Sequence, residues 1–174
     1  QETKNGLDVA INGNGFFEVT MPDGTIGYTR DGSFQVDAQG RVVTSSGLPV
    51  ANGITVPQGA TSISISADGV VSAIVAGNTQ PQQLGSLAMS SFINPAGLEP
   101  VGQNLFKESA ASGQPQQGTP GTNGLGFIKQ GFLESSNINV VEELVNMIQT
   151  QRAYEMNSKA IQTSDQMLAK LSQL

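Results

Sequence analysis

Hydrophobic positions in the last third of the chain recur at spacings of three and four residues, which is typical of an α-helix. No Gly or Pro occurs after Gly131, and the spacing predicts one long helix over Asn139–Leu174. At 1.5 Å per residue this helix would be roughly 50 Å long, which is more than one small domain can cover. Asn139 is placed to cap its first turn, and Glu142 completes a capping box.

The apolar positions of the predicted helix form two sets instead of one, which implies that other helices cover it on two sides. The first set is Val140, Leu144, Met147, Tyr154, Ile161 and Leu168. The second set is Val141, Val145, Ile148, Met156, Ala160, Met167, Leu171 and Leu174. A less favoured alternative is an ordinary amphipathic helix that packs on its own domain. Polar residues interrupt the first set and either fix the packing register or line a central channel; they are Gln151, Ser158 and Asp165.

From Leu7 to about Phe92 the pattern changes to period-two alternation in short runs, which predicts half-buried β-strands. The runs are 7–11, 16–21, 26–30, 33–36, 41–44, 63–66, 70–75 and 84–92. Asn-Gly and Asp-Gly pairs between the runs favour tight hairpins. We therefore expect an antiparallel β sandwich or a partly open barrel. A bent edge strand over 50–57 and a last short strand over 127–133 complete the prediction.

The stretch from Lys107 to Gly126 has nothing larger than Ala to bury before Leu125. Such a composition cannot offset the entropy of ordering the backbone, so it predicts a long polar connection along the surface. The expected organisation is a β-rich domain over 1–133, with a connector at about 94–131, followed by a helical segment over 134–174.

Composition excludes several classes of function. The 174 residues contain no Cys, His or Trp, which removes disulfides, thiolate nucleophiles and zinc–thiolate sites. The net charge is −6 with only 8 Lys and Arg, so nucleic-acid binding is not expected. No apolar run is long enough to span a membrane, and we expect no direct membrane insertion. Gln1 is not an initiator Met, so we interpret the chain as a fragment.

No residue pattern predicts a catalytic, cofactor or metal site. Asp23, Asp31 and Asp68 each precede Gly, where the carboxylate stabilises a turn through neighbouring backbone. A catalytic triad is impossible without His, and Lys129 in a strand is a weak candidate base. A pocket holding two carboxylates within about 10 Å of each other would instead favour a hydrolase.

Three strings, taken together, resemble the bacterial flagellar rod and hook proteins. They are LDVAINGNGFFEV at 7–19, YTRDGSFQVDAQGRVVTSSGLPV at 28–50 and ESSNINVVEELVNMIQTQRAYEMNSKAIQTSDQMLAKLSQL at 134–174. The match covers nearly the whole chain in order, and the last string is the most specific. It favours the distal rod branch of the family over the hook and proximal rod branches. The family's N-terminal helix and the Asn-rich segment after it have no counterpart here.

The resemblance implies a structural subunit of a helical tube that transmits torque from motor to hook and has no catalytic activity. Its terminal helices would pack as an inner coiled-coil layer, with the β-rich domain outside. The implied partners are further copies of the subunit, the neighbouring proximal rod and hook proteins, and surrounding ring proteins. The implied location is the basal body, from periplasm to outer membrane, after export without a cleaved signal peptide. An alternative from another class is a cell-wall- or glycan-binding module.

Overall fold

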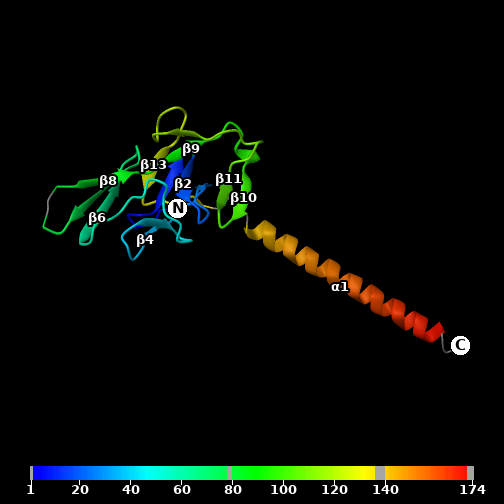
Figure 1. The fold of residues 1–174 in the computed structure, drawn as a ribbon. Helices are drawn as coiled ribbons and strands as arrows, with labels where there is room; N and C mark the ends of the chain where they lie inside the picture. Colours follow the sequence, from blue (N-terminus) through cyan, green and yellow to red (C-terminus); the bar gives the residue numbers. More distant parts are fainter. Residues whose placement is uncertain (1, 78–79, 136–139, 172–174) are drawn as a thin grey trace. The chain divides into compact units, whose positions relative to one another are not determined.

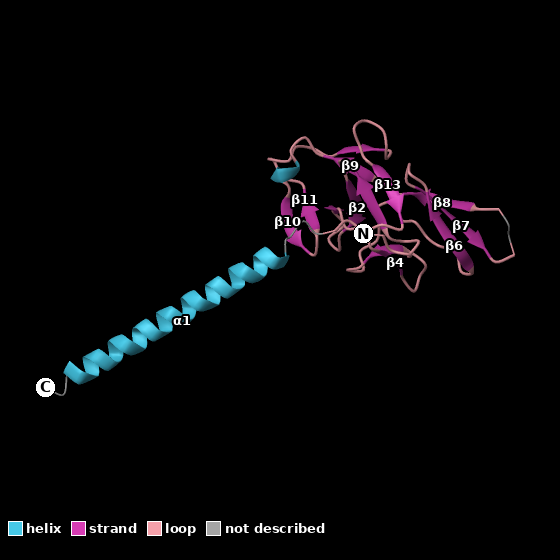
Figure 2. Ribbon diagram, turned by 180° about the vertical axis from the view of Figure 1, so that it is seen from behind, coloured by secondary structure: helices cyan, strands magenta, loops and turns pink. Residues whose placement is uncertain are grey.

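The computed structural model describes residues 2–77, 80–135 and 140–171. Contacts between residues divide the chain into two compact units, Gln1–Ser135 and Ser136–Leu174. Strands make up the first unit and one long helix makes up the second (Figures 1 and 2). The predicted fold class, mainly β with a long C-terminal helix, is confirmed.

The largest sheet of the β unit has six strands in the order β10-β11-β3-β2-β9-β12, and each pair of neighbours is antiparallel. Its strands are β2 (Phe16–Thr20), β3 (Ile26–Thr29), β9 (Met89–Ser91), β10 (Glu99–Gly102), β11 (Leu105–Lys107) and β12 (Gln116–Gly118). Strand β2 lies near the middle, and four of its five residues are buried. Alternation along β2 sends Phe17 to one face of the sheet and Phe16 and Glu18 to the other.

Three smaller antiparallel sheets complete the β unit, and none of the sheets in the described ranges closes into a barrel. They are β1 (Val9–Asn12) with β13 (Phe127–Gln130), β4 (Phe34–Val36) with β5 (Val42–Thr44), and β6 (Ala60–Ile65) with β7 (Val70–Val75) and β8 (Gln82–Ser86). A short 3₁₀ turn, Pro95–Gly97, precedes β10.

Two hydrophobic clusters form the core of the β unit. The larger contains Phe17 and Phe34, whose rings meet edge to face at 5.3 Å. The smaller is aromatic, and in it the rings of Tyr28 and Phe92 lie 4.8 Å apart beside Phe16. Fully burying a large apolar side chain contributes about 1.5–3 kcal/mol, so both clusters stabilise the central sheet.

Two strand predictions differ from the structure. The predicted run 84–92 is two strands, because its two ends belong to different sheets: β8 pairs with β7, and β9 pairs with β2 and β12. The predicted edge strand at 50–57 makes only isolated bridges, from Val50 to Val19 and from Thr55 to Arg41. Ile54 within it is fully buried, so this segment covers the core instead of extending a sheet edge.

The long polar connection expected after Lys107 contains an unpredicted strand, β12, which forms one edge of the six-stranded sheet. Strands β10 and β11, in the looser segment before it, were also not predicted. Leu98 and Leu105 are buried and hold this part of the chain against the sheet. Local hydrogen bonds order polar residues within the segment, as at buried Ser112, whose hydroxyl lies 2.9 Å from the carbonyl of Ser109.

The helical unit contains α1 (Val140–Leu171), as the sequence predicts. Glu142 and Glu143 lie in its first turn, where negative charge is stabilised by the helix dipole. The predicted cap, Asn139, lies outside the described residues. No helix in the described ranges is long and apolar enough to cross a membrane.

Candidate assembly surface

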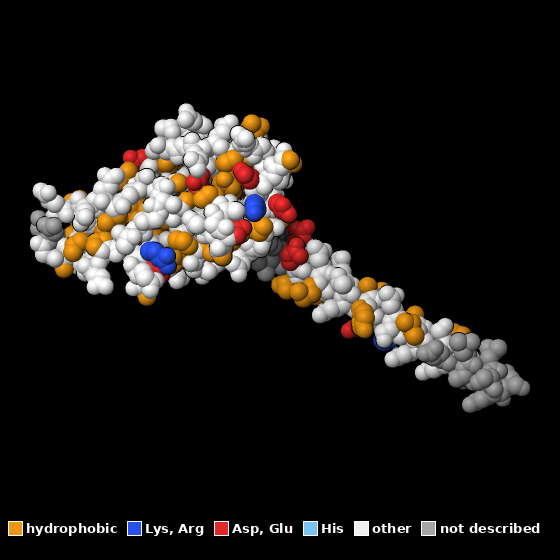
Figure 3. Space-filling view, viewed as in Figure 1, with side chains coloured by type: hydrophobic (Ala, Val, Ile, Leu, Met, Phe, Trp, Pro, Cys, Tyr) orange, Lys and Arg blue, Asp and Glu red, His pale blue; other side chains and the backbone are white. Residues whose placement is uncertain are grey.

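The residues predicted to pack against other subunits all lie on α1 except Leu174, and those whose side chains are described are exposed. Figure 3 shows hydrophobic side chains at the surface along the described part of the helix. Their exposed fractions run from 45% at Val145 to 78% at Tyr154. The set is Val141, Leu144, Val145, Met147, Ile148, Tyr154, Met156, Ile161 and Met167. The side chains of Val140, Leu168 and Leu171 are not described, although their backbone is helical, and Leu174 lies outside the described residues. Their role in packing stays a prediction.

One apolar line on α1 has a strict seven-residue repeat. Its positions are Val140, Met147, Tyr154, Ile161 and Leu168, with Leu144 beside the first two. A straight helix drifts by about 20° per seven residues, so a partner that follows this line must wind around α1 with a left-handed supercoil. This line therefore suits a coiled-coil partner.

A second apolar line has a different repeat. Val145, Met156 and Met167 recur every eleven residues, a period that drifts in the opposite sense and favours a straight or right-handed contact. Tyr154 and Met156, two residues apart, lie about 200° apart around the axis, so the two lines face opposite sides at mid-helix. A single partner cannot cover both lines.

Two threonines on these faces are already satisfied within the helix. The Thr150 hydroxyl donates to the carbonyl of Asn146 at 2.8 Å, and the Thr163 hydroxyl donates to that of Lys159 at 2.7 Å. At about 100° per residue, Thr150 flanks the seven-residue line and Thr163 lies on the eleven-residue line. Neither hydroxyl needs a partner from outside, so both can enter a dry interface without a desolvation penalty.

Polar positions follow the seven-residue line at the same period, at Gln151, Ser158 and Asp165. Gln151 and Ser158 are exposed, and the side chain of Asp165 is not described. The helical unit contains no described element other than α1, so nothing within that unit covers either apolar line. The two predicted roles of the polar positions, register and channel lining, both remain open.

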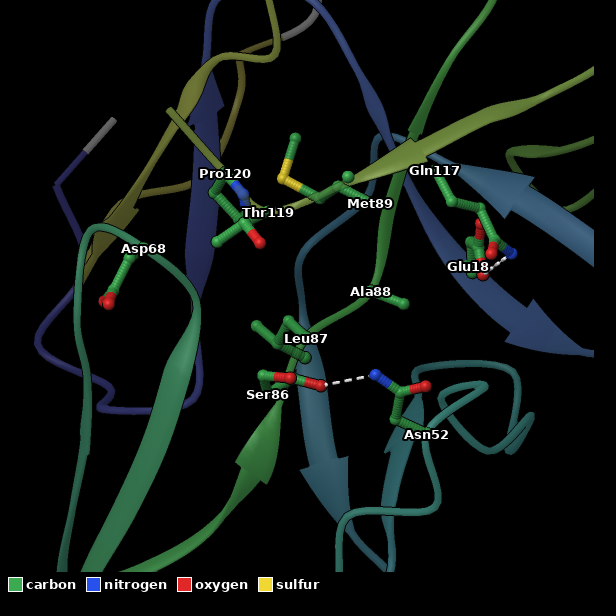
Figure 4. Close-up of a pocket in the computed structure, with 11 residues that line it drawn as sticks. Glu18, Asn52, Asp68, Ser86, Leu87, Ala88, Met89, Gln117, Thr119 and Pro120 are labelled. Atoms are coloured by element: carbon green, nitrogen blue, oxygen red, sulfur yellow. Dashed lines mark hydrogen bonds between the residues drawn. The ribbon is translucent and has the colours of Figure 1, made fainter. Parts of the chain in front are cut away.

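The β unit has a cavity of about 200 Å³ whose lining includes two carboxylates, Glu18 and Asp68 (Figure 4). In Figure 4 they lie at opposite ends of the view. Glu18 is only 3% exposed and accepts a hydrogen bond from the Ser90 hydroxyl and another, at 3.0 Å, from the amide of Gln117. Sequence reasoning missed this cluster. A lone Glu in the apolar string FFEVT was the only signal for it.

Paired carboxylates hydrolyse glycosides when one of them has a raised pKa and acts as a general acid. The Ser66 hydroxyl donates to Asp68 and is the main reason that the pKa of Asp68 is lowered. That direction is opposite to the one a general acid needs, so Asp68 does not suit that role.

The other candidate chemical groups have structural partners. The carboxylate of Asp23 accepts hydrogen bonds from the hydroxyl and backbone N–H of Thr25, which lower the pKa of Asp23. Asp31 accepts the same pair from Ser33, so the predicted turn roles of both residues are confirmed. The ammonium of Lys129 lies 3.8 Å from the ring centre of Phe132. Among the described residues no group of three or more acidic, His or Cys side chains could hold a metal ion.

Comparison with known proteins gives matches to one family in both the β unit and the helical unit. The model for the flagellar hook protein FlgE/F/G D1 domain matches residues 10–73, and that for the flagellar basal body rod FlgEFG protein C-terminal region matches residues 129–174. The flagellar basal-body rod protein FlgG of Bacillus subtilis is 42% identical over 179 aligned residues, which cover all of this chain and 67% of that protein. The chain therefore belongs to the flagellar hook and basal-body rod protein family.

Within the family, the similarity over nearly the full chain is to rod proteins. The flagellar basal-body rod protein FlgG of Buchnera aphidicola subsp. Acyrthosiphon pisum is 59% identical over 173 residues, covering 99% of this chain. The chain spans 66% of the length of that relative. The flagellar hook protein FlgE of Borreliella burgdorferi is 44% identical over only 93 residues, or 53% of this chain and 21% of that protein.

Proposed function

We propose that this chain is part of a structural subunit of the distal rod of the flagellar basal body. The subunit polymerises into a helical tube that transmits torque from the motor to the hook. Full-length similarity to proteins named FlgG supports the rod over the hook, because the hook match covers about half of the chain. The proposed partners are further copies of the subunit, the adjoining proximal rod and hook proteins, and ring proteins around the rod.

The observation that carries the proposal is the pair of apolar lines on α1. The seven-residue line is the surface for a coiled-coil partner helix, and the eleven-residue line is the surface for a helix of a neighbouring copy. Each large apolar side chain that becomes buried contributes about 1.5–3 kcal/mol, so a dozen such positions support a strong lateral interface. The β unit then forms the outer layer of the tube.

A catalytic role is not part of the proposal. The only two carboxylates that line the Glu18 cavity are bonded to neutral donors, and Asp68 has a lowered rather than raised pKa. A glycan-binding module is also less well supported. Of the two tyrosines in the chain, Tyr28 lies in the buried aromatic cluster and Tyr154 lies on the helix, so neither gives the β unit an exposed platform.

The test is the double substitution Leu144→Asp and Ile148→Asp in the full-length protein. It places two charges about 40° apart around the axis, one at a member of each predicted apolar set. A buried unpaired carboxylate is far more costly than the lost apolar contact. We expect rods to be absent from cells that carry it, as counted by electron microscopy of purified basal bodies. The β unit should remain folded, as measured by the near-ultraviolet circular dichroism of the purified protein.

The matched control is Asn146→Asp with Asn157→Asp, which adds the same charge between the two apolar lines. At about 100° per residue, these positions face about 240° and 260° from Val140, away from both lines. We expect this variant to form normal rods. Normal rods in the Leu144 and Ile148 variant would refute the assembly role of α1.

A further inference from the structure

The segment that leads from the β unit toward α1 is held at several successive points. This lead-out segment, residues 127–135, begins with β13, which pairs with β1 from Asn12↔Phe127 to Val9↔Gln130. A segment that only connected two units would need no such series of contacts, and surface connections are usually the more mobile parts of a protein.

Gln130 fastens the segment to a second sheet through its side chain. Its amide nitrogen donates to the carbonyls of Gly6 at 2.6 Å and Ile63 at 3.0 Å, and its amide oxygen accepts the N–H of Ile65 at 3.1 Å. The side chain thus bonds β6 as a neighbouring strand would. It joins the β1–β13 pair to the three-stranded sheet, where the two sheets have no shared ladder.

The next residue is held through its backbone. The N–H of Gly131 donates to the carbonyl of Asp8, and its carbonyl accepts the N–H of Thr3, both at 2.7 Å. Gly131 has φ +76°, a left-handed conformation that favours glycine. Phe132 then bridges to Glu2. Residues near the N-terminus therefore hold the lead-out segment as far as Phe132, three residues before the end of the β unit.

Arg30 makes the last contact before the helical unit. Its Nε donates to the carboxylate of Glu134 at 2.9 Å. The same guanidinium donates to the carbonyls of Gly13 at 3.1 Å and Gly15 at 3.3 Å, and it lies 5.8 Å from the ring centre of Phe16. An isolated surface ion pair contributes little, because two long side chains must be ordered. Here the other bonds already hold the guanidinium, so only Glu134 has to be ordered.

We propose that the lead-out segment is a stiff coupling on the β unit, through which force enters or leaves that unit along the chain, with Gln130 and Arg30 as its positioning residues. This rests on the proposed function, because only a torque-transmitting subunit needs such a coupling. Arg suits the position because its planar group can bond three acceptors in fixed directions, which a lysine ammonium on a flexible stem cannot do.

Hydrogen exchange of the purified 174-residue chain tests the coupling without reference to assembly. Arg30→Met keeps the apolar stem over Phe16 and removes all three bonds, and Glu134→Gln removes the charge on the other side. We expect either variant to speed amide exchange at residues 131–135 by about threefold to tenfold, on the scale of local opening free energies. Both variants break the same contact, the bond between Arg30 and Glu134. The double variant should therefore exchange no faster than Arg30→Met alone.

Lys107→Met is the matched control, since it removes the same kind of charge from a contact elsewhere, the 3.8 Å pair between Lys107 and Asp23. It should leave exchange at 131–135 unchanged. Unchanged exchange in Arg30→Met, or an equal increase in Lys107→Met, would overturn the proposal.

In cells, the full-length protein with Arg30→Met should still form rods, because the surface of α1 is intact. Swimming speed in viscous medium should fall below that of cells with Lys107→Met. Equal speeds would overturn the mechanical role even if exchange changes. This outcome is distinct from failure of the proposed function, which is decided by the Leu144 and Ile148 variant.

Discussion

Glu18 shows how a single residue can organise a sheet. It lies in the buried middle strand β2, and its described partners are neutral: the hydroxyl of Ser90 on β9 and the amide of Gln117 on β12. Charge-assisted hydrogen bonds of this kind are about twice as strong as neutral ones. The carboxylate therefore ties strand β12 to the centre of the sheet. This bond matters because the residues of β12, QQG, offer little apolar surface to bury.

We expect Glu18→Gln to lower the free energy of unfolding by about 1–3 kcal/mol. The substituted amide has one acceptor oxygen, and its NH₂ group would face the donor of Ser90 or of Gln117. Urea unfolding of the purified chain measures the change. Gln117→Ala removes only one exposed donor and should cost less than about 1 kcal/mol. A Glu18→Gln protein as stable as the parent would show that the charge of Glu18 has no part in holding the sheet.

Tyr28 gives the β unit a specific alkaline response. Burial raises its pKa to about 12, with smaller effects from the charges of Glu18 and Glu108. Since the folded-state pKa is above the ordinary value of about 10, ionisation favours the unfolded chain. The stability that this contributes is complete below pH 10 and is lost as the pH rises toward 12.

In a Tyr154→Phe variant, Tyr28 is the only tyrosine, so tyrosinate absorbance reports it alone. We expect an absorbance midpoint near pH 12 while the chain is folded. Guanidinium chloride should return the midpoint to about 10. A midpoint near 10 in the folded protein would mean that Tyr28 is open to solvent.

At the scale of elements, the sequence pattern predicts strands and helices whose side chains alternate between core and solvent. It misses strands that are held mainly by hydrogen bonds. Ten of the observed strands overlap predicted runs and α1 falls within its predicted span, because their side chains alternate between core and solvent or follow one helical spacing. Strand β10 has the sequence EPVG with every residue exposed, and β12 has QQG, so neither has an alternation to detect. These strands exist because neighbouring Leu98 and Leu105 are buried and because Gln117 reaches Glu18.

The apolar surface of α1 was also predictable from a repeating sequence pattern. The apolar positions of α1 repeat in sequence, so their faces follow from helix geometry alone. The bond from Arg30 to Glu134 spans 104 positions, and the bonds of the Gln130 side chain to Gly6, Ile63 and Ile65 span 124, 67 and 65. No local pattern encodes such a pairing, and only the folded chain brings it together.

Helix α1 should associate with copies of itself when its natural partners are absent. A helix without tertiary packing is marginal in water, and this one exposes apolar residues on two sides. We expect amide protection over 141–167 to increase when the concentration of the purified chain is raised about a hundredfold, since pairing follows mass action. Hydrogen exchange at the two concentrations measures this.

The Leu144→Asp and Ile148→Asp variant should lose this dependence on concentration. Strong protection that is independent of concentration would mean that the chain's own β unit covers the helix. That result would contradict the assembly surface.

At the scale of the whole molecule, the proposed function gives the two units different roles in a polymer subunit. The β unit completes its own core, with Phe17, Phe34 and the aromatic cluster buried inside it. The helical unit has no core of its own within the described residues and depends on other helices for one. A subunit of this kind can reach its final structure only in the growing assembly, which keeps free subunits from being stable competitors of the polymer.

The two repeats on α1 also limit the geometry of any filament built from it. Over the helix, the seven-residue line turns by roughly 80° in one sense, and the eleven-residue line turns by roughly 40° in the other. The angle between the two lines around the axis thus changes by about 120° from the first turn to the last. Flat rafts of parallel rods cannot satisfy this divergence. Each helix must therefore contact successive neighbouring molecules along its length. Such a staggered lattice resists shear between adjacent rows.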